Sequence, residues 1–150
     1  YNGCMGVFDP RPGRVDSLAP GKSRFSSLCP TIVFQNDEPY LVIGAPGGTQ
    51  IAMGVLQAML NVIDFDMDMQ QAVQAPRFSA TSDAIDISNR IPDYIVRPLR
   101  EMGYAVQRLP MGFAFALVHG IQSVRGTMNG GADPGGDGMA LLVEPGDVAG

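Results

Sequence analysis

Two short runs of β-branched, aromatic and aliphatic residues lie close together in the first third of the chain. They occupy Thr31–Gln35 and residues 40–43, and the four residues between them, 36–39, read Asn-Asp-Glu-Pro. Residues of the first kind favour strands, and a polar stretch with proline favours a turn. The pattern therefore predicts an antiparallel hairpin.

A helical period follows the glycine-rich stretch at residues 44–48. Apolar residues recur at three- and four-residue spacing from Ile51 to Ile63, which predicts a buried helix. Thr49 comes just before this pattern, and its hydroxyl can accept a hydrogen bond from a free backbone N–H of the first turn. We therefore expect Thr49 to be the N-cap.

Two shorter helices are indicated by their end signals. Asp68 with Gln71 three positions later matches a capping box, and the helix that it begins is stopped by Pro76. A Pro-Asp pair suits the first turn of a further helix over residues 92–103. We expect a kink at Pro98, because proline removes one backbone hydrogen bond from the helix interior.

Strand-like runs return in the last part of the chain, at residues 115–118, 121–124 and 139–143. The glycine-rich stretch 129–138 separates the last two, and residues 1–24 contain so many glycines and prolines that we expect an ordered loop there. A hairpin, then helices, then strands indicates the α+β class, with helices covering one face of an antiparallel sheet.

Length and charge narrow the class of protein. A chain of 150 residues with 45% hydrophobic content fits a single domain over residues 1–150. The net charge of −5 leaves no basic stripe for a phosphate backbone, so nucleic acid is not an expected partner. The longest apolar runs fall far short of the roughly 20 residues that a membrane-spanning helix needs.

The two cysteines, Cys4 and Cys29, are too few for a disulfide framework and have no ligand-spaced partners. Free thiols favour a reducing compartment, so we expect a cytoplasmic rather than a periplasmic location. The chain begins at Tyr1, without an initiator methionine or a signal peptide, and we expect it to be a processing product or a segment of a longer chain.

Two segments carry residues that can bind or stabilise an anion. Ser26 and Ser27 place neighbouring hydroxyls before a strand, where a turn would let both donate to one carboxylate. Gly47 and Gly48 stand where a strand leads into a helix, and exposed backbone N–H groups at such a point can form an oxyanion hole. From residue types alone, a serine-rich bend and a tight glycine turn remain the simpler interpretations.

A metal site is not expected. Asp64, Asp66 and Asp68 resemble the opening of a calcium loop, but the glycine position holds Met69 and the final acidic position holds Ala75.

Cofactor and histidine chemistry are not expected either. The glycine spacing after residue 44 does not match a dinucleotide fingerprint, and residues 129–138 lack the lysine of a phosphate-binding loop. His119 is the one histidine in the chain, between apolar Val118 and Gly120, and is more typical of a structural residue. No Ser–His or Cys–His pair can form elsewhere in the chain.

Five short motifs, in this order, cover nearly the whole chain. They are Pro20-Gly21-Lys22, Ser26-Ser27-Leu28-Cys29-Pro30-Thr31-Ile32-Val33, Ala45-Pro46-Gly47-Gly48, Ala75-Pro76-Arg77-Phe78 and Ala132-Asp133-Pro134. Their order and the helices between them resemble the C-terminal part of the small subunit of the gamma-glutamyltransferase family.

The resemblance implies an N-terminal-nucleophile hydrolase with a four-layer αββα sandwich, to which this chain gives antiparallel strands and covering helices. A precursor cleaves itself, and the new N-terminal threonine of the small subunit attacks an amide carbonyl with its own α-amine as base. The large subunit of the same precursor would be the partner. By this resemblance Ser26 and Ser27 hold a substrate carboxylate, and Gly47 and Gly48 form the oxyanion hole.

Two departures from the family pattern concern the substrate and the nucleophile. Tyr1 cannot be the nucleophile, so the threonine would lie upstream of this chain. Cys4 and Val7 stand where family members acting on gamma-glutamyl groups hold the substrate's α-amino group, and neither offers a carboxylate. Residues 8–13 instead resemble the acylase-like branch.

We therefore expect an amidohydrolase or acyltransferase that acts on acidic acyl donors without an α-amine. Two alternatives remain open: a true gamma-glutamyltranspeptidase acting on glutathione-like substrates, and an inactive family member that serves as a binding subunit.

Overall fold

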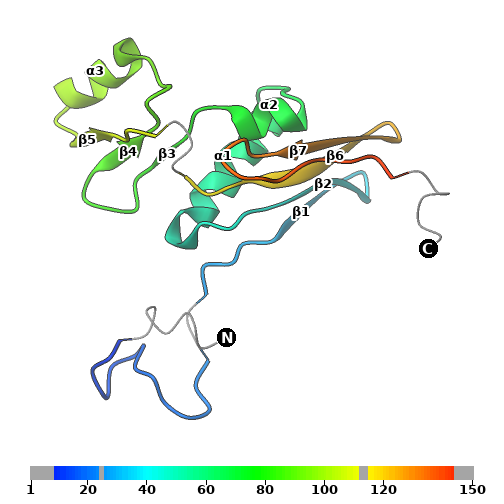
Figure 1. Cartoon of the computed structure of the whole chain (residues 1–150). Coiled ribbons are helices and arrows are strands. Elements are labelled where there is room, and N and C mark those ends of the chain that lie inside the picture. The colour runs from blue at the N-terminus through cyan, green and yellow to red at the C-terminus, as the bar shows by residue number, and fades with distance from the viewer. Residues whose placement is uncertain (1–8, 24–25, 112–114, 144–150) are drawn as a thin grey trace.

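The computed structural model describes residues 9–23, 26–111 and 115–143. Its main feature is a four-stranded sheet in the order β1-β2-β6-β7, with every neighbouring pair antiparallel (Figure 1). The strands are β1 (Thr31–Gln35), β2 (Glu38–Gly44), β6 (His119–Val124) and β7 (Thr127–Ala132). Helices α1 (Ile51–Ile63) and α2 (Met69–Gln74) pack on one face of this sheet. The expected α+β arrangement is confirmed.

The predicted hairpin is present, with a shorter turn than the sequence suggests. Asn36 and Asp37 have φ angles of 54° and 64°, which makes a two-residue turn, and Glu38 and Pro39 join the second strand. Proline is tolerated at this position because β6 pairs with β2 only from Leu41 onward.

The buried helix α1 is confirmed, but Thr49 is not its N-cap. A short 3-10 turn, η2 (Gly48–Gln50), connects the β2 exit to the helix and takes up Thr49. Gln50 is the N-cap of α1, without a side-chain cap, and its N–H donates to the Gly47 carbonyl at 3.3 Å. Because the left-handed glycines lead into this 3-10 turn, the N-cap of α1 is Gln50 instead of the predicted Thr49.

The core lies between the sheet and the two helices. Leu41 of β2 is fully buried, and α1 contributes the apolar stripe that the helical period predicts. The buried cluster comprises Leu41, Ile43, Ile51, Val55, Ala58, Val62, Met69, Ala72, Val73 and Val118. Each valine, leucine, isoleucine or methionine side chain of the cluster contributes roughly 1.5–3 kcal/mol through burial. Ile63, at the end of the stripe, is instead 43% exposed.

Helix α2 begins with the predicted capping box. The Gln71 N–H donates to Asp68 Oδ1 at 2.8 Å, and the Asp68 N–H donates to Gln71 Oε1 at 3.2 Å. The helix approaches β7 so closely that a Cβ at Gly131 would lie 2.6 Å from the Met69 carbonyl oxygen. Glycine at this position of the strand is therefore a requirement of packing.

The sequence interpretation missed β7 and placed two strands wrongly. Residues 115–118 are buried but form no strand, because side chains and loops bind their backbone groups. Residues 139–143 form no strand either, and Gly130 packs closely against Ala140 of this segment. Strand β7 overlaps the glycine-rich stretch 129–138, for which the sequence pattern predicts a connection. The pattern indicates no strand there because Asn129, Gly130 and Gly131 are poor strand formers.

A second, smaller sheet is formed by residues that lie between α2 and β6 in the chain. Three short strands, β3 (Phe78–Ser79), β4 (Ile85–Ile87) and β5 (Val106–Arg108), form a three-stranded sheet in which β4 and β5 are parallel. Helix α3 (Asp93–Glu101) has Pro92 as N-cap and continues through Pro98, ending two residues before the predicted boundary. The kink at Pro98 stays a prediction.

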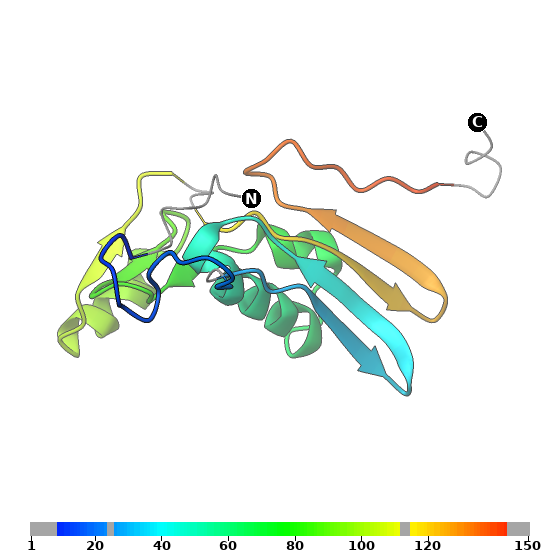
Figure 2. The same cartoon turned by 90° about the horizontal axis from the view of Figure 1, so that it is seen from below.

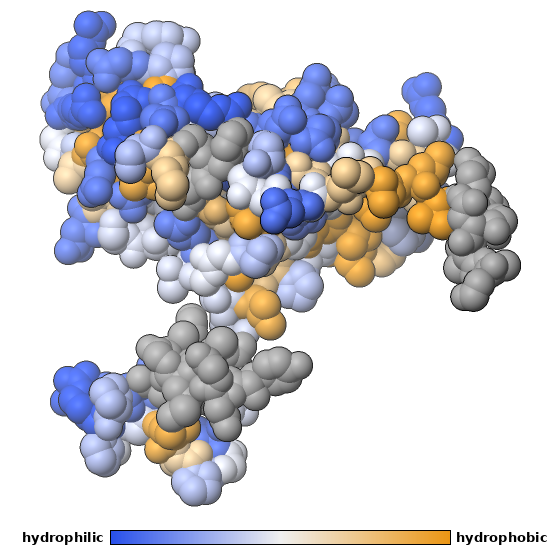
Figure 3. Space-filling view, in the orientation of Figure 1, coloured by the Kyte–Doolittle hydropathy of each residue, from blue (hydrophilic) through white to orange (hydrophobic). Residues whose placement is uncertain are grey.

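The face of the main sheet opposite the helices is apolar and open to solvent over much of its area. It presents Ile32, Phe34, Val42, Ile121 and Met128, which are 46–70% exposed. Figure 3 shows apolar side chains gathered on the same part of the molecule as the C-terminal segment. Within the described ranges, no helix is long and apolar enough to span a membrane.

Candidate functional site

One end of the main sheet carries the serine pair, the glycine turn and the Ala-Asp-Pro motif that the sequence singles out. The register places Thr31 opposite Ile43, Gly44 opposite His119, and His119 opposite Ala132. The stretches 26–30, 45–48, 115–118 and 133–137 therefore meet at this end, which we call the loop end (Figure 2). The opposite hairpin end consists of the turns at residues 36–37 and 125–126.

The turn at Gly47 and Gly48 has a backbone conformation that favours glycine at both positions. Their φ angles are 150° and 61°, and both residues are exposed. Within the described part of the chain, neither N–H has a hydrogen-bond acceptor, so both remain available for a ligand. A Cβ at Gly47 would lie 2.6 Å from Cα of Ala116, whereas a Cβ at Gly48 would meet nothing within 4 Å.

Ser26 and Ser27 lie just before β1 at the same end. Ser26 is exposed, and its Oγ accepts a hydrogen bond from the Leu28 N–H at 3.3 Å. Ser27 is half-buried. Cys29 follows as a free thiol packed against the core, with Sγ 3.8 Å from Thr31 Oγ1. Cys4 and Val7 lie outside the described residues.

A buried ion pair lies on the interior side of the loop end. The Arg77 guanidinium binds the Asp133 carboxylate, and the two side chains are 3% and 0% exposed. Arg77 also donates to the carbonyls of Val73 at 2.7 Å and Ala116 at 3.1 Å. Asp133 Oδ1 accepts from the Gly135 N–H at 2.8 Å. Both residues belong to motifs that the sequence singles out, but a structural role for the pair was not predicted.

The segment between the ion pair and the glycine turn is Ala116–Leu117. The Leu117 N–H donates to the Pro46 carbonyl at 3.0 Å, and the methyl group of Ala116 fits against Gly47 and Gly54. Three of the five motifs are therefore joined through one extended segment. No local sequence signal indicates the pair, because arginine and aspartate are mostly exposed and are rarely buried unless they are paired.

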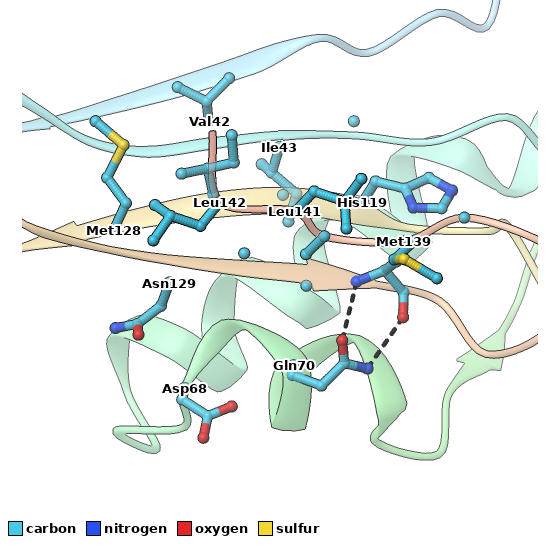
Figure 4. Close-up of a pocket in the computed structure, with 18 of the residues that line it drawn as sticks. Val42, Ile43, Asp68, Gln70, His119, Met128, Asn129, Met139, Leu141 and Leu142 are labelled. Carbon is cyan, nitrogen blue, oxygen red and sulfur yellow. Dashed lines mark hydrogen bonds between the residues drawn. The ribbon is translucent and has the colours of Figure 1, made fainter. Parts of the chain in front are cut away.

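A groove on the outer face of the sheet does not contain this site. It is lined mainly by apolar residues of β2, β6, β7 and the C-terminal segment, among them Val42, Met128 and Leu141 (Figure 4). Gln70 forms two hydrogen bonds with the Ala132 backbone and so fastens α2 to β7. His119 lies in the groove wall, where its imidazole packs against Gly138, as expected of a structural residue.

The acidic residues around position 66 have a structural role in part, since Asp68 caps α2. Among the described residues, no group of three potential metal ligands is clustered.

The loop before the serine pair contains an ion pair of its own. Arg11 Nε and Nη2 donate to the two carboxylate oxygens of Asp9 at 2.9 and 2.7 Å, and Ser17 Oγ accepts from the Arg14 N–H at 2.7 Å. The Arg11 guanidinium lowers the pKa of Asp9 below its ordinary value of 3.8. Asp9 is therefore ionised at neutral pH and committed to Arg11.

These features define a class of fold: one layer of helices on one antiparallel sheet, with the other sheet face open and a turn of two positive-φ glycines at one end. The family pattern described as Gamma-glutamyltranspeptidase matches residues 3–143. The chain belongs to the gamma-glutamyltranspeptidase family, whose fold is that of the N-terminal-nucleophile hydrolases.

Relatives with two different names match this chain about equally well. The acylase ACY 1 proenzyme of Pseudomonas sp. (strain SE83) is 32% identical over 149 residues, which are 97% of this chain and 26% of that protein. The glutathione hydrolase proenzyme of Bacillus subtilis (strain 168) is 33% identical over 137 residues, which are 91% of this chain and 23% of that protein. The chain spans about a quarter of the length of these curated relatives.

The fold is shared with solved structures of the family. A mutant of Helicobacter pylori gamma-glutamyltranspeptidase superposes with a TM-score of 0.78 at 33% identity, covering 89% of this chain and 79% of that one. Overall identity does not separate the two kinds of relative, so residues of the site have to decide between them.

Proposed function

We propose that this chain is the C-terminal part of the small subunit of an amide-cleaving enzyme, with Gly47 and Gly48 as its oxyanion hole. The observation that carries this proposal is the glycine turn itself. Two adjacent left-handed glycines expose N–H groups that no described residue binds, at the point where a strand leads into a helix. Such N–H groups can stabilise the charge that develops on a carbonyl oxygen during attack.

The nucleophile in this proposal is a threonine upstream of the chain. Its hydroxyl oxygen adds to the amide carbon while its proton passes to the threonine's own α-amine, and the two glycine N–H groups receive the resulting oxyanion. The C–N bond then breaks, and the leaving amine takes the proton from the α-ammonium. Water or an acceptor amine attacks the remaining ester and restores the threonine.

The acyl donor is one with a free carboxylate. Ser26 and Ser27 lie at the same sheet end as the glycine turn, and their hydroxyls can donate to a carboxylate. Cys4 and Val7 provide no anion for a substrate ammonium, which would lose its hydration without gaining a charged partner. Acidic acyl groups without an α-amine are therefore the favoured donors, as in an acylase.

A true gamma-glutamyltranspeptidase is the second candidate. The 33% identity to the Bacillus subtilis glutathione hydrolase proenzyme supports this second candidate as strongly as the 32% identity to the acylase ACY 1 proenzyme supports an acylase. In that case residues other than Cys4 and Val7 hold the α-amine.

The partner is the large subunit of the same precursor. The exposed apolar sheet face, with Ile32, Phe34 and Val42 about half accessible, calls for a covering layer that this chain does not provide. The named relatives are proenzymes. Expressed alone, the chain should aggregate or stay partly unfolded, and a soluble chain with cooperative unfolding would contradict this pairing.

The test uses the complete precursor with its upstream segment. Hydrolysis of glutaryl anilide is compared with that of gamma-glutamyl anilide, and Gly48→Ala is compared with Gly126→Ala. The two glycines are matched, because their φ angles are 61° and 80° and neither would have a Cβ contact within 4 Å. Only the first lies at the loop end.

The proposal expects preference for glutaryl anilide and a large loss of kcat in Gly48→Ala alone. Preference for the gamma-glutamyl substrate would favour the second candidate. Equal kcat in both glycine variants, or a precursor that cleaves neither anilide, would overturn the oxyanion assignment. A precursor that lacks the upstream threonine would indicate an inactive binding subunit.

A further inference from the structure

We propose that Arg77 and Asp133 are positioning residues for the Gly47–Gly48 turn and act through Ala116 and Leu117. This inference rests on the function proposed above. It assigns the buried ion pair to the chemistry of the oxyanion hole, although neither charged side chain reaches the exposed turn itself.

The first step is the clamp on the extended segment 115–118. Arg77 donates to the Ala116 carbonyl at 3.1 Å, and Asp133 accepts from the Val118 N–H at 3.3 Å through the same oxygen that binds Arg77. The Asp133 N–H donates back to the Val118 carbonyl at 3.0 Å. The ion pair therefore holds the backbone on both sides of Leu117, in a segment that no strand pairing supports.

The second step is the contact between this segment and the glycine turn. The Leu117 N–H donates to the carbonyl of Pro46, the residue before the turn, at 3.0 Å. Ala116 is fully buried, and its Cβ would lie 2.6 Å from a Cβ added at Gly47 and 3.0 Å from one added at Gly54. Its methyl group thus fills a space bounded by the turn and helix α1, so a shift of Ala116 shifts Gly47.

The third step is that stability alone does not explain an ion pair at this place. Replacing a buried ion pair by packed apolar residues is often neutral or stabilising, because charges lose hydration on burial. Arg77 Nε is also buried without a hydrogen-bond partner in the described structure, which adds to that cost. The guanidinium provides what an apolar side chain cannot: fixed directions to the carboxylate and to the carbonyls of Val73 and Ala116.

Two variants of the complete enzyme test the clamp and the contact separately. Arg77→Lys keeps the charge but replaces the planar fork by a single ammonium, which cannot reproduce all these directions. Ala116→Gly keeps both charges and removes the methyl group that touches Gly47. The matched control is Val62→Ala, which opens a cavity in α1 at a side chain 1% exposed and outside the clamp.

Three measurements are made on each variant. Titration of the acyl-enzyme burst gives the concentration of active sites, steady-state kinetics give kcat and KM per active site, and hydrogen exchange reports on peptides covering residues 44–50 and 115–118. We expect Arg77→Lys and Ala116→Gly, the two clamp variants, to lower kcat by roughly tenfold or more. KM should change less than about twofold, as when a transition-state interaction is weakened. Exchange should rise in both peptides.

Val62→Ala should lower thermal stability and leave kcat per active site unchanged. The double variant of Arg77→Lys and Ala116→Gly should lose less than the product of the single losses, because both act on one path.

The inference is overturned if the clamp variants behave as the Val62 control does, or if the two losses multiply. If Arg77→Lys yields no active enzyme, Ala116→Gly decides by the same readouts, since both charges remain. Failure of the proposed function is distinguishable, because Gly48→Ala would then leave kcat unchanged. If Gly48→Ala lowers kcat and the clamp variants do not, only the positioning role fails.

Discussion

The two ends of the main sheet use left-handed backbone in different ways. At the hairpin end, residues 36–37 and 125–126 have positive φ angles and join neighbouring strands in turns of two residues. At the loop end, Gly47 and Gly48 have positive φ angles as well, but the chain leaves the sheet there for α1. Similar local geometry thus closes the sheet at one end and leads the chain out of the sheet into a helix at the other.

The ion pairs of the loop end and of helix α3 differ in burial. The loop end contains Arg77 and Asp133, both nearly inaccessible, whereas the ion pair Arg97–Glu101 on α3 is exposed and has an N–O distance of 3.8 Å. Burying charge is costly and is tolerated where geometry matters. We infer that the buried pair at the loop end is retained for a defined geometry, and the variants that follow test this difference from the exposed pair.

The largest effect on stability is expected from Asp133→Ala. Removing one partner leaves the Arg77 charge buried and uncompensated, which costs about 3–5 kcal/mol. Glu101→Ala breaks the exposed pair and should cost no more than about 0.5 kcal/mol. Urea unfolding of the mature enzyme at pH 7 measures both, and similar shifts in the two variants would show that burial of the pair carries no energetic consequence.

The largest effect on catalysis is expected from Gly47→Ala. An added Cβ would clash with the Ala116 backbone at 2.6 Å and also strain a φ angle of 150°. Alanine keeps the backbone N–H but displaces it from the oxyanion, and complete loss of one such donor lowers kcat by about 10²–10³. Gly48→Ala meets no atom within 4 Å, so its loss of kcat should be the smaller of the two. The reverse order would mean that contact with Ala116 does not position the turn.

Ser26→Ala should have an intermediate effect that depends on the substrate. A hydrogen bond to a charged group contributes about 1.5–3 kcal/mol, so kcat/KM for carboxylate-bearing donors should fall by roughly 10- to 150-fold. Neutral amides should be unaffected.

Ser82→Ala is the matched control, because Ser82 Oγ accepts from the Ala84 N–H at 3.3 Å in the same local motif. Loss of activity toward neutral amides in Ser26→Ala would assign Ser26 to chain geometry rather than to carboxylate binding.

The local patterns of the sequence were sufficient for elements that local interactions specify. The hairpin, the α1 stripe and the capping box at Asp68 each depend on residues within a few positions of one another. Strand β7 could not be read in this way, because Gly131 is selected by contact with α2 rather than by strand propensity. The wrong strand at 115–118 has a similar cause, since its backbone partners come from Pro46, Arg77 and Asp133.

The site was predicted only as far as its separate motifs. Residue type offered the serine pair and the glycine turn only beside simpler interpretations, and the family resemblance selected them; the register places both at one sheet end. The ion pair that joins Arg77 to Asp133 spans 56 positions, and no periodicity connects residues at that separation.

The smallest expected effect is a gain in stability at the hairpin end. Asp37 has a φ angle of 64° after Asn36 at 54°, and a turn with both angles positive favours Asn-Gly. Asp37→Gly removes the steric cost of a left-handed aspartate, although glycine also makes the unfolded chain more flexible. The net gain should be less than about 1 kcal/mol. Thermal unfolding measures it against Asp83→Gly, a change of the same type at an exposed position of the small-sheet loop.

Because the turn lies at the far end of the strands from Gly47, kcat and KM should not change in Asp37→Gly. A higher midpoint with unchanged kinetics would show that the two ends respond independently. A change in kcat would mean that β1 and β2 transmit the hairpin geometry to the glycine turn, and the separation between a closing end and a functional end would then have to be abandoned.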